Sequence, residues 1–187
     1  MYSRIRVAPG IVRPSEVVPE PWANGLGVTR VLVSQPRVRI SIAEMEGRMP
    51  FSPLPAVDRT LIPLNAWGVA LEIGGARHRV RAHEPVRFRG EDEVFAETGL
   101  RRTTVVNVMT PRESSVADCE IRRGTDAPID GVDAIIVLGG QVSLPTGDGW
   151  LSPGTVVLPD GREGVVSSEA GIVALVRLRN AGAEASA

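Results

Sequence analysis

The sequence predicts an all-β protein organised as a double jelly-roll β-barrel, and three observations lead to this prediction. Twenty glycines and fifteen prolines divide the 187 residues into short segments. Most of these segments are rich in Val, Ile and Leu and are too short to form good helices. The same order of strands and turns occurs twice along the chain, and closing each set of strands into a barrel removes exposed sheet edges.

The clearest early strand covers residues 37–44, with the sequence RVRISIAE. Successive side chains of a strand point to opposite faces, so Arg39, Ser41 and Ala43 share one face and the two isoleucines share the other. This alternation predicts a half-buried strand whose polar face lies toward water or toward a cavity.

The other strands are Val-, Ile- or Leu-rich runs that end at Gly or Pro turns. In chain order they cover residues 68–73, 78–81, 85–88, 103–109, 134–138, 155–158 and 172–178. The segments 67–109 and 134–178 share one plan, in which a Gly-Gly turn joins the first two strands and a Pro- or Gly-led strand follows. This repeat predicts a bicupin-like pair of barrels. The alternative is a single β-sandwich, in which the two segments resemble each other only because β-hairpins in general use similar strand and turn residues.

We therefore expect a single bicupin-like unit over residues 1–187. Its N-terminal barrel is expected at residues 1–118 and its C-terminal barrel at residues 119–180, with residues 124–133 as the best candidate for the crossover between them. The small, polar tail of residues 181–187 is expected to fray.

The balance of charges disfavours several classes of partner. Twenty-one basic and twenty-two acidic residues give a net charge of -1, without a basic block that would neutralise nucleic-acid phosphates or anionic lipids. We expect no nucleic acid and no membrane among the partners. The N-terminus lacks a signal-peptide core and no run approaches the roughly 18 apolar residues of a membrane span, so we expect a cytoplasmic protein. Cys119, the only cysteine, is expected to be a buried, inert thiol.

The sequence predicts no metal and no cofactor. His78 and His83 are the only histidines, and their odd separation points them to opposite faces of a regular strand, whereas a barrel metal site needs imidazoles on one face. Asp148, Asp160 and Glu163 fall in turns and are interpreted as solvated charges. Phosphate-binding loops and nucleophile elbows are absent, so neither a hydrolase nor a dehydrogenase is indicated.

A set of polar residues falls where an apolar barrel would not place them by chance. The candidate ligand-binding residues are Asn24, Thr29, Arg30, Ser41, Glu44, Asp58, Arg59 and Asn107. An Arg side chain presents a planar fork that fits a carboxylate, and Asn both donates and accepts, so this set is suited to clasp a small carboxylated metabolite. Alternatively, Glu44 and Asp58 pair with Arg30 or Arg59 in ion pairs that hold loops together.

The same residues carry a resemblance to a known family. The stretches PWANGLGVTRVLV, RISIAE, PFSPLPAVDRTLIPL, EPVRFRGEDEV and VNVMTPR occur in this order between residues 20 and 112 and resemble the HutD/Ves family of bacterial cupin-like proteins. Leu26, Val31, Val38 and Val105 depart from the family pattern, because each places an aliphatic side chain where a polar, flexible or aromatic group is usual. The resemblance implies a bicupin fold, a homodimer and a role in histidine utilisation.

Three functions are open at this level. The first, which the resemblance implies, is a non-enzymatic protein that binds a urocanate- or formylglutamate-like carboxylate and regulates histidine catabolism. The second is a metal-independent cupin isomerase or lyase that uses Glu44 or Asp58 as its base. The third is a structural or protein-interaction module in which the polar residues only hold the scaffold together.

Overall fold

A computed structural model of the protein describes residues 10–22, 24–124, 127–143, 149–159, 165–166 and 170–182. Within these ranges every regular element is a β-strand except a single turn of 3-10 helix at Pro14–Glu16, so the all-β prediction is confirmed. The same ranges contain no helix that is long and apolar enough to cross a membrane. The chain divides into two compact units, one formed by Val17–Val116 and the other by Met1–Glu16 with Ala117–Ala187.

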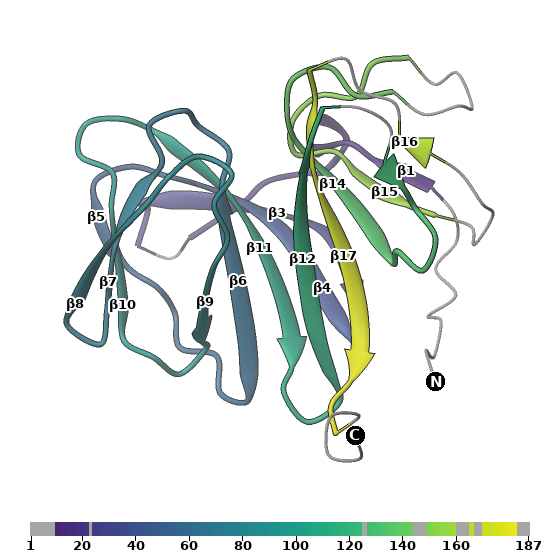
Figure 1. Cartoon of the computed structure of the whole chain (residues 1–187). Helices are drawn as coiled ribbons and strands as arrows, with labels where there is room; N and C mark the ends of the chain where they lie inside the picture. Colours follow the sequence, from purple (N-terminus) through teal and green to yellow (C-terminus); the bar gives the residue numbers. More distant parts are fainter. Residues whose placement is uncertain are drawn as a thin grey trace. The chain divides into compact units, whose positions relative to one another are not determined.

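The unit of residues 17–116 is built from two antiparallel sheets (Figure 1). The six-stranded sheet has the order β2 (Glu20–Pro21), β3 (Gly27–Gln35), β4 (Val38–Met45), β11 (Thr103–Pro111), β6 (Val57–Pro63) and β9 (Val86–Arg89). The four-stranded sheet has the order β5 (Arg48–Pro50), β10 (Val94–Glu97), β7 (Val69–Ile73) and β8 (Ala76–Val80). Because β11 lies between β4 and β6, the centre of the larger sheet is completed by a strand that is distant in sequence.

The core of this unit is apolar and receives side chains from both sheets. Met45, Leu61 and Val105 come from the six-stranded sheet, whereas Met49 and Leu71 come from the four-stranded sheet, and each is at most 1% exposed. Apolar area removed from water contributes roughly 25 cal/mol per Å², so this shared core is the main force that holds the two sheets against each other.

Strand alternation places the odd-numbered side chains of the central strands on the face that meets this core. Ala43 of β4 belongs to the core, and Arg39 and Ser41 lie on the same face of the strand. Ser41 is paired with Asn107 of β11, which is paired in turn with Leu61 of β6. The polar face predicted for this strand therefore continues the inner face of the sheet beyond the apolar core.

The second unit contains a five-stranded sheet and a two-stranded sheet. The five-stranded sheet has the order β1 (Gly10–Val12), β15 (Val156–Leu158), β14 (Ala134–Gly139), β17 (Ile172–Asn180) and β12 (Ser115–Arg123). The two-stranded sheet pairs β13 (Ala127–Pro128) with β16 (Val165–Val166). The core is aliphatic, with Ile135, Val137 and Leu175 almost completely buried. Because β1 pairs with β15, residues from the start of the chain complete a sheet formed mainly by its end.

The eight strands predicted from composition are all present, with ends that agree to within about two residues. The eight ranges do not include the long strands β3, β6 and β12, the four-residue β10, or the short strands β1, β2, β5, β13 and β16. In β6 the polar pair Asp58 and Arg59 obscures the strand pattern, but pairing with β11 on one side and β9 on the other keeps the segment extended.

Several sequence-based expectations fall on parts of the chain outside the described residues. These are residues 125–126 of the crossover candidate, residues 183–187 of the tail, and the turn residues Asp148, Asp160 and Glu163. The limits expected for the two barrels, 1–118 and 119–180, stay a prediction.

Candidate functional site

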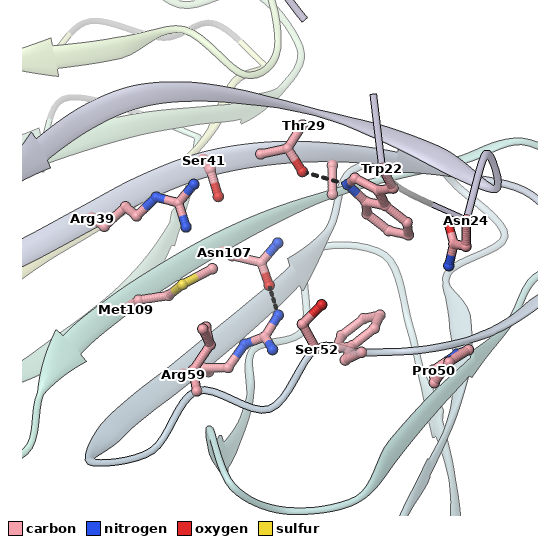
Figure 2. Close-up of a pocket in the computed structure, with 13 residues that line it drawn as sticks. Trp22, Asn24, Thr29, Arg39, Ser41, Pro50, Ser52, Arg59, Asn107 and Met109 are labelled. Carbon is pink, nitrogen blue, oxygen red and sulfur yellow. Dashed lines mark hydrogen bonds between the residues drawn. The ribbon is translucent and has the colours of Figure 1, made fainter. Parts of the chain in front are cut away.

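A pocket of about 430 Å³ opens in the unit of residues 17–116 (Figure 2). It is lined by Trp22, Asn24, Thr29, Arg39, Ser41, Ala43, Pro50, Phe51, Ser52, Leu54, Arg59, Asn107 and Met109. Figure 2 shows Arg39, Ser41 and Arg59 at one end, with Trp22 and Asn24 at the other. The pocket therefore has a cationic end and an end that presents an indole ring.

Neighbouring strands of the six-stranded sheet deliver the polar side chains to this pocket. Thr29 of β3 is paired with Ala43 of β4. Met109 of β11 is paired with Arg39 of β4 on one side and with Arg59 of β6 on the other. Cross-strand partners point to the same face of a sheet, so this register gathers the side chains of both arginines on the inner face.

Arg59 is the dominant charge of the pocket. It is only 7% exposed, and its Nη2 donates to Asn107 Oδ1 at 3.3 Å. Its guanidinium carbon lies 4.8 Å from the ring centre of Phe51 and 5.2 Å from that of Phe88, so both ring faces stabilise the cation. Burial, with a smaller contribution from the nearby Arg39 charge, lowers the pKa of Arg59 to about 10, and the side chain stays charged at neutral pH.

Two buried polar atoms at the cationic end have no hydrogen-bond partner within the described protein. They are Oγ of Ser41, a residue that is 1% exposed, and Nε of Arg59. No carboxylate among the described residues pairs with Arg59 either. An unpaired buried polar group costs about 1–3 kcal/mol, so both atoms favour a ligand that supplies hydrogen-bond partners.

Trp22 is held at the other end of the pocket by a close approach of the backbone at Gly27. A Cβ atom at Gly27 would lie 2.9 Å from the Trp22 ring, so only glycine leaves room for the indole. Trp22 Nε1 donates to Thr29 Oγ1 at 2.7 Å, and Asn24 Oδ1 accepts from the Leu26 amide at 3.0 Å. The Gly-x-Gly stretch therefore fixes the position of Trp22, an aromatic side chain that lines the pocket.

Of the candidate residues identified from the sequence, the pocket gathers Asn24, Thr29, Ser41, Arg59 and Asn107. The remaining three lie outside its lining. Arg30 pairs with Glu44, and Asp58 accepts a hydrogen bond from Arg112 Nε at 2.7 Å. Each of the three is adjacent in sequence to a pocket residue, so its side chain points to the opposite face of its strand. The ion-pair alternative is the arrangement found for Arg30 and Glu44.

The substitution Arg30→Gln is expected to leave carboxylate affinity within about twofold of wild type and to lower the free energy of unfolding by about 1 kcal/mol at most. The reason is that Arg30 is engaged by Glu44 on the face away from the pocket. Chemical denaturation and a binding titration measure the two effects. A tenfold loss of affinity would place Arg30 in the site.

Sequence reasoning did not include Trp22, Arg39, Phe51 or Ser52 in the site. The alternation in residues 37–44 already placed Arg39 on the same face as Ser41, and this pattern could have identified Arg39 as a site residue. Phe51 and Ser52 follow β5 in a segment without regular structure, where no periodicity indicates the direction of a side chain.

The pocket does not offer the donors of a transition-metal site. Its lining residues include no His, Cys, Asp or Glu. Across the described ranges, no group of three or more such side chains is placed to hold a metal ion. His78 is exposed on β8 and His83 lies in the turn that follows, and neither lines the pocket. The side chains present favour hydrogen bonding to an anion over metal coordination.

Comparison with known proteins relates the chain to a bacterial family. The family model described as HutD matches residues 14–170. Protein Ves of Cronobacter sakazakii is 36% identical over 107 residues, a match that spans 54% of this chain and 59% of that protein. The matched part therefore covers only a little more than half of this curated relative.

Solved structures show the same fold. HutD from Pseudomonas fluorescens SBW25 superimposes with a TM-score of 0.77 at 19% identity, covering 92% of this chain and all of its own. A conserved protein of unknown function from Pseudomonas aeruginosa PAO1 gives 0.77 at 22% identity, with 92% and 99% coverage. A cupin 2 conserved barrel domain protein from Leptotrichia buccalis gives 0.61 at 14% identity, with 96% and 100% coverage, so the fold is cupin-like. Because the HutD family model matches most of the length of this chain, the chain belongs to the HutD family.

Proposed function

We propose that the protein binds a small carboxylated metabolite in the pocket between Arg59 and Trp22, without transforming it. The observation that carries this proposal is the buried Arg59 guanidinium, which faces the pocket with an unpaired Nε and without a carboxylate partner among the described residues. A buried cation of this kind is costly unless an anion reaches it. A ligand carboxylate supplies the missing charge and the missing acceptor together.

The geometry suggests how such a ligand is held. Its carboxylate accepts hydrogen bonds from Arg59 and Ser41 and is drawn also by the charge of Arg39. The rest of the molecule extends toward Trp22 and Pro50, which line the other end (Figure 2). A volume of about 430 Å³ exceeds what a carboxylate alone requires and leaves room for a body of several heavy atoms.

Binding is favoured over catalysis because the lining residues contain no general base. The two carboxylates considered for an isomerase or lyase, Glu44 and Asp58, pair with Arg30 and Arg112 and do not line this pocket. A base must lie within hydrogen-bond reach of the proton that it removes, and neither group meets this condition for a ligand at Arg59.

We propose further that the bound molecule is urocanate- or formylglutamate-like and that binding regulates histidine catabolism, with the protein acting in the cytoplasm as a homodimer. Membership of the HutD family supports this assignment. The structure of HutD from Pseudomonas fluorescens SBW25 was determined in a formate condition, and formate is the smallest carboxylate. A regulatory ligand would act by shifting the population of conformations or complexes.

The proposal is tested by thermal unfolding in the presence of urocanate, N-formylglutamate, glutamate and formate, each at concentrations up to millimolar. Formamide serves as a matched neutral control for formate. At 100 times its dissociation constant, a ligand stabilises the folded state by about 2.7 kcal/mol, which raises Tm by several degrees. If no carboxylate raises Tm, or if formamide and formate act alike, the pocket is not a carboxylate site.

Carboxylate affinity is expected to be constant between about pH 6 and pH 9 and to decrease outside this range. Below a pKa of about 4 the ligand carboxylate gains a proton and loses its charge. Above the lowered pKa of Arg59, about 10, the guanidinium loses its proton, so the charge on the protein side decreases. Isothermal titration calorimetry across this range measures the profile. A midpoint near neutral pH would show that another group controls binding.

A further inference from the structure

One wall of the pocket is a segment without regular structure. Residues 51–56 connect β5 to β6, and Phe51, Ser52 and Leu54 of this segment line the pocket. Two of its six residues are prolines, which have no amide hydrogen to donate. Only a few backbone hydrogen bonds are therefore available to hold residues 51–56, which we call the pocket wall.

The pocket wall is anchored to the turn between β9 and β10 and to Val94, the first residue of β10. The Leu54 amide donates to the Gly90 carbonyl oxygen at 2.8 Å, and the Phe51 amide donates to the Val94 carbonyl oxygen at 2.8 Å. The Gly90 amide donates in turn to the Val57 carbonyl oxygen at 2.6 Å. The position of this turn thus sets the position of the wall, and with it the phenyl ring on which the buried guanidinium rests.

Arg112, the residue after β11, holds the same turn through its side chain. Its Nη1 and Nη2 donate to the two carboxylate oxygens of Glu91 at 2.6 and 2.9 Å. Its Nε donates to Asp58 Oδ1 at 2.7 Å, and Nη2 also donates to the Val57 carbonyl oxygen at 3.3 Å. The Arg112 amide donates to the Ala56 carbonyl oxygen at 2.9 Å. One guanidinium therefore connects the turn with the start of β6, where the wall ends.

We propose that Arg112 is a positioning residue for the pocket, because its two-pronged bond to Glu91 holds the β9–β10 turn where Leu54 and the rest of the wall can dock. Arg112 does not itself line the pocket, so its effect on a ligand passes through the wall. The effect on ligand affinity rests on the proposed function, whereas the effect on the wall does not.

The geometry of Arg112 differs from that of an ordinary surface ion pair. A single exposed pair contributes little, but a planar guanidinium that bonds two carboxylates and a carbonyl oxygen fixes the relative orientation of three segments. The hydrogen bonds from Arg112 lower the pKa of Glu91 to about 2, so the pair stays ionised at neutral pH. Arg77, which makes one contact of 3.0 Å to Glu97 in the four-stranded sheet, offers a matched control without a link to the wall.

The test is hydrogen exchange measured by mass spectrometry on the full chain, for wild type and for Arg112→Gln, Glu91→Gln and Arg77→Gln. We expect the amides of residues 51–57 to exchange about tenfold faster in the first two variants and at the wild-type rate in the third. Because the contribution of Glu91 passes through Arg112, the double variant is expected to exchange at the same rate as Arg112→Gln. Titration with N-formylglutamate and with urocanate is expected to show a loss of affinity of about tenfold for Arg112→Gln and Glu91→Gln, and no loss for Arg77→Gln.

Unchanged exchange in residues 51–57 of both Arg112→Gln and Glu91→Gln would overturn the proposal. Equal acceleration in Arg77→Gln would overturn it as well, because the effect would then be one of general stability. Glu91→Gln keeps the test decisive if Arg112→Gln fails to fold, since it removes the charge and one of the two acceptor oxygens at position 91 and leaves the bond to Asp58 in place. If the wild type binds neither probe, the proposed function fails, and the exchange rates still decide the role of Arg112.

Discussion

Replacing Arg59 by Met is expected to abolish carboxylate binding and to keep the free energy of unfolding within about 2 kcal/mol of the wild-type value. Hydrogen bonds to a charged group contribute about 1.5–3 kcal/mol each, so losing the guanidinium should weaken binding by about 100-fold or more. Removing the buried charge relieves its desolvation, which the lowered pKa of Arg59 indicates, and this gain offsets the loss of the hydrogen bond to Asn107. Met fills a similar volume without the charge and can rest on the rings of Phe51 and Phe88.

Calorimetric titration with a carboxylate, together with urea denaturation, measures both parts of this result. Arg59→Lys is the informative companion, because it keeps the charge but loses the planar fork and should retain only part of the affinity. Arg77→Gln, on the outer side of the other sheet, controls for the loss of a positive charge. Full affinity in Arg59→Met would remove the central support for the proposed function, and marked destabilisation would show that the Arg59 cation stabilises the fold by itself.

The substitution Gly90→Ala is expected to produce the largest loss of stability among the changes considered. A Cβ atom at this position would lie 2.2 Å from the Leu54 carbonyl oxygen and 2.9 Å from that of Val57, and both contacts are to backbone that cannot rotate away. The turn must then move, and the bonds that join Gly90 to Leu54 and Val57 break or lengthen. We expect a loss of more than about 2 kcal/mol in the free energy of unfolding.

Thermal and urea denaturation of Gly90→Ala measure this loss. Glu93→Ala is the matched control, because Glu93 is an exposed residue of the same turn and should tolerate alanine within about 0.5 kcal/mol. Where Gly90→Ala remains folded, its carboxylate affinity is also expected to fall, because the displaced Leu54 lines the pocket. If Gly90→Ala is as stable as wild type, the pocket wall can shift away from the turn without a loss of stability.

The strands and part of the site could be predicted because both depend on neighbours along the chain. The alternation in residues 37–44 correctly placed Arg39 and Ser41 on one polar face. Asn107 was selected as a polar residue within an apolar run, and the structure pairs it with Ser41. The strand β6 was missed because its polar start interrupts the pattern, although it carries the most important charge of the pocket.

By itself, the sequence determined that the chain is β-rich, where eight of its strands lie, and that arginines were available to bind an anion. Only the tertiary structure decided that Arg59 enters the pocket while Arg30 is paired with Glu44 on the other face. The physical reason is register, since a shift of one residue reverses the face of every side chain. The register of β3, β4, β11 and β6 is set by contacts between segments far apart in the chain.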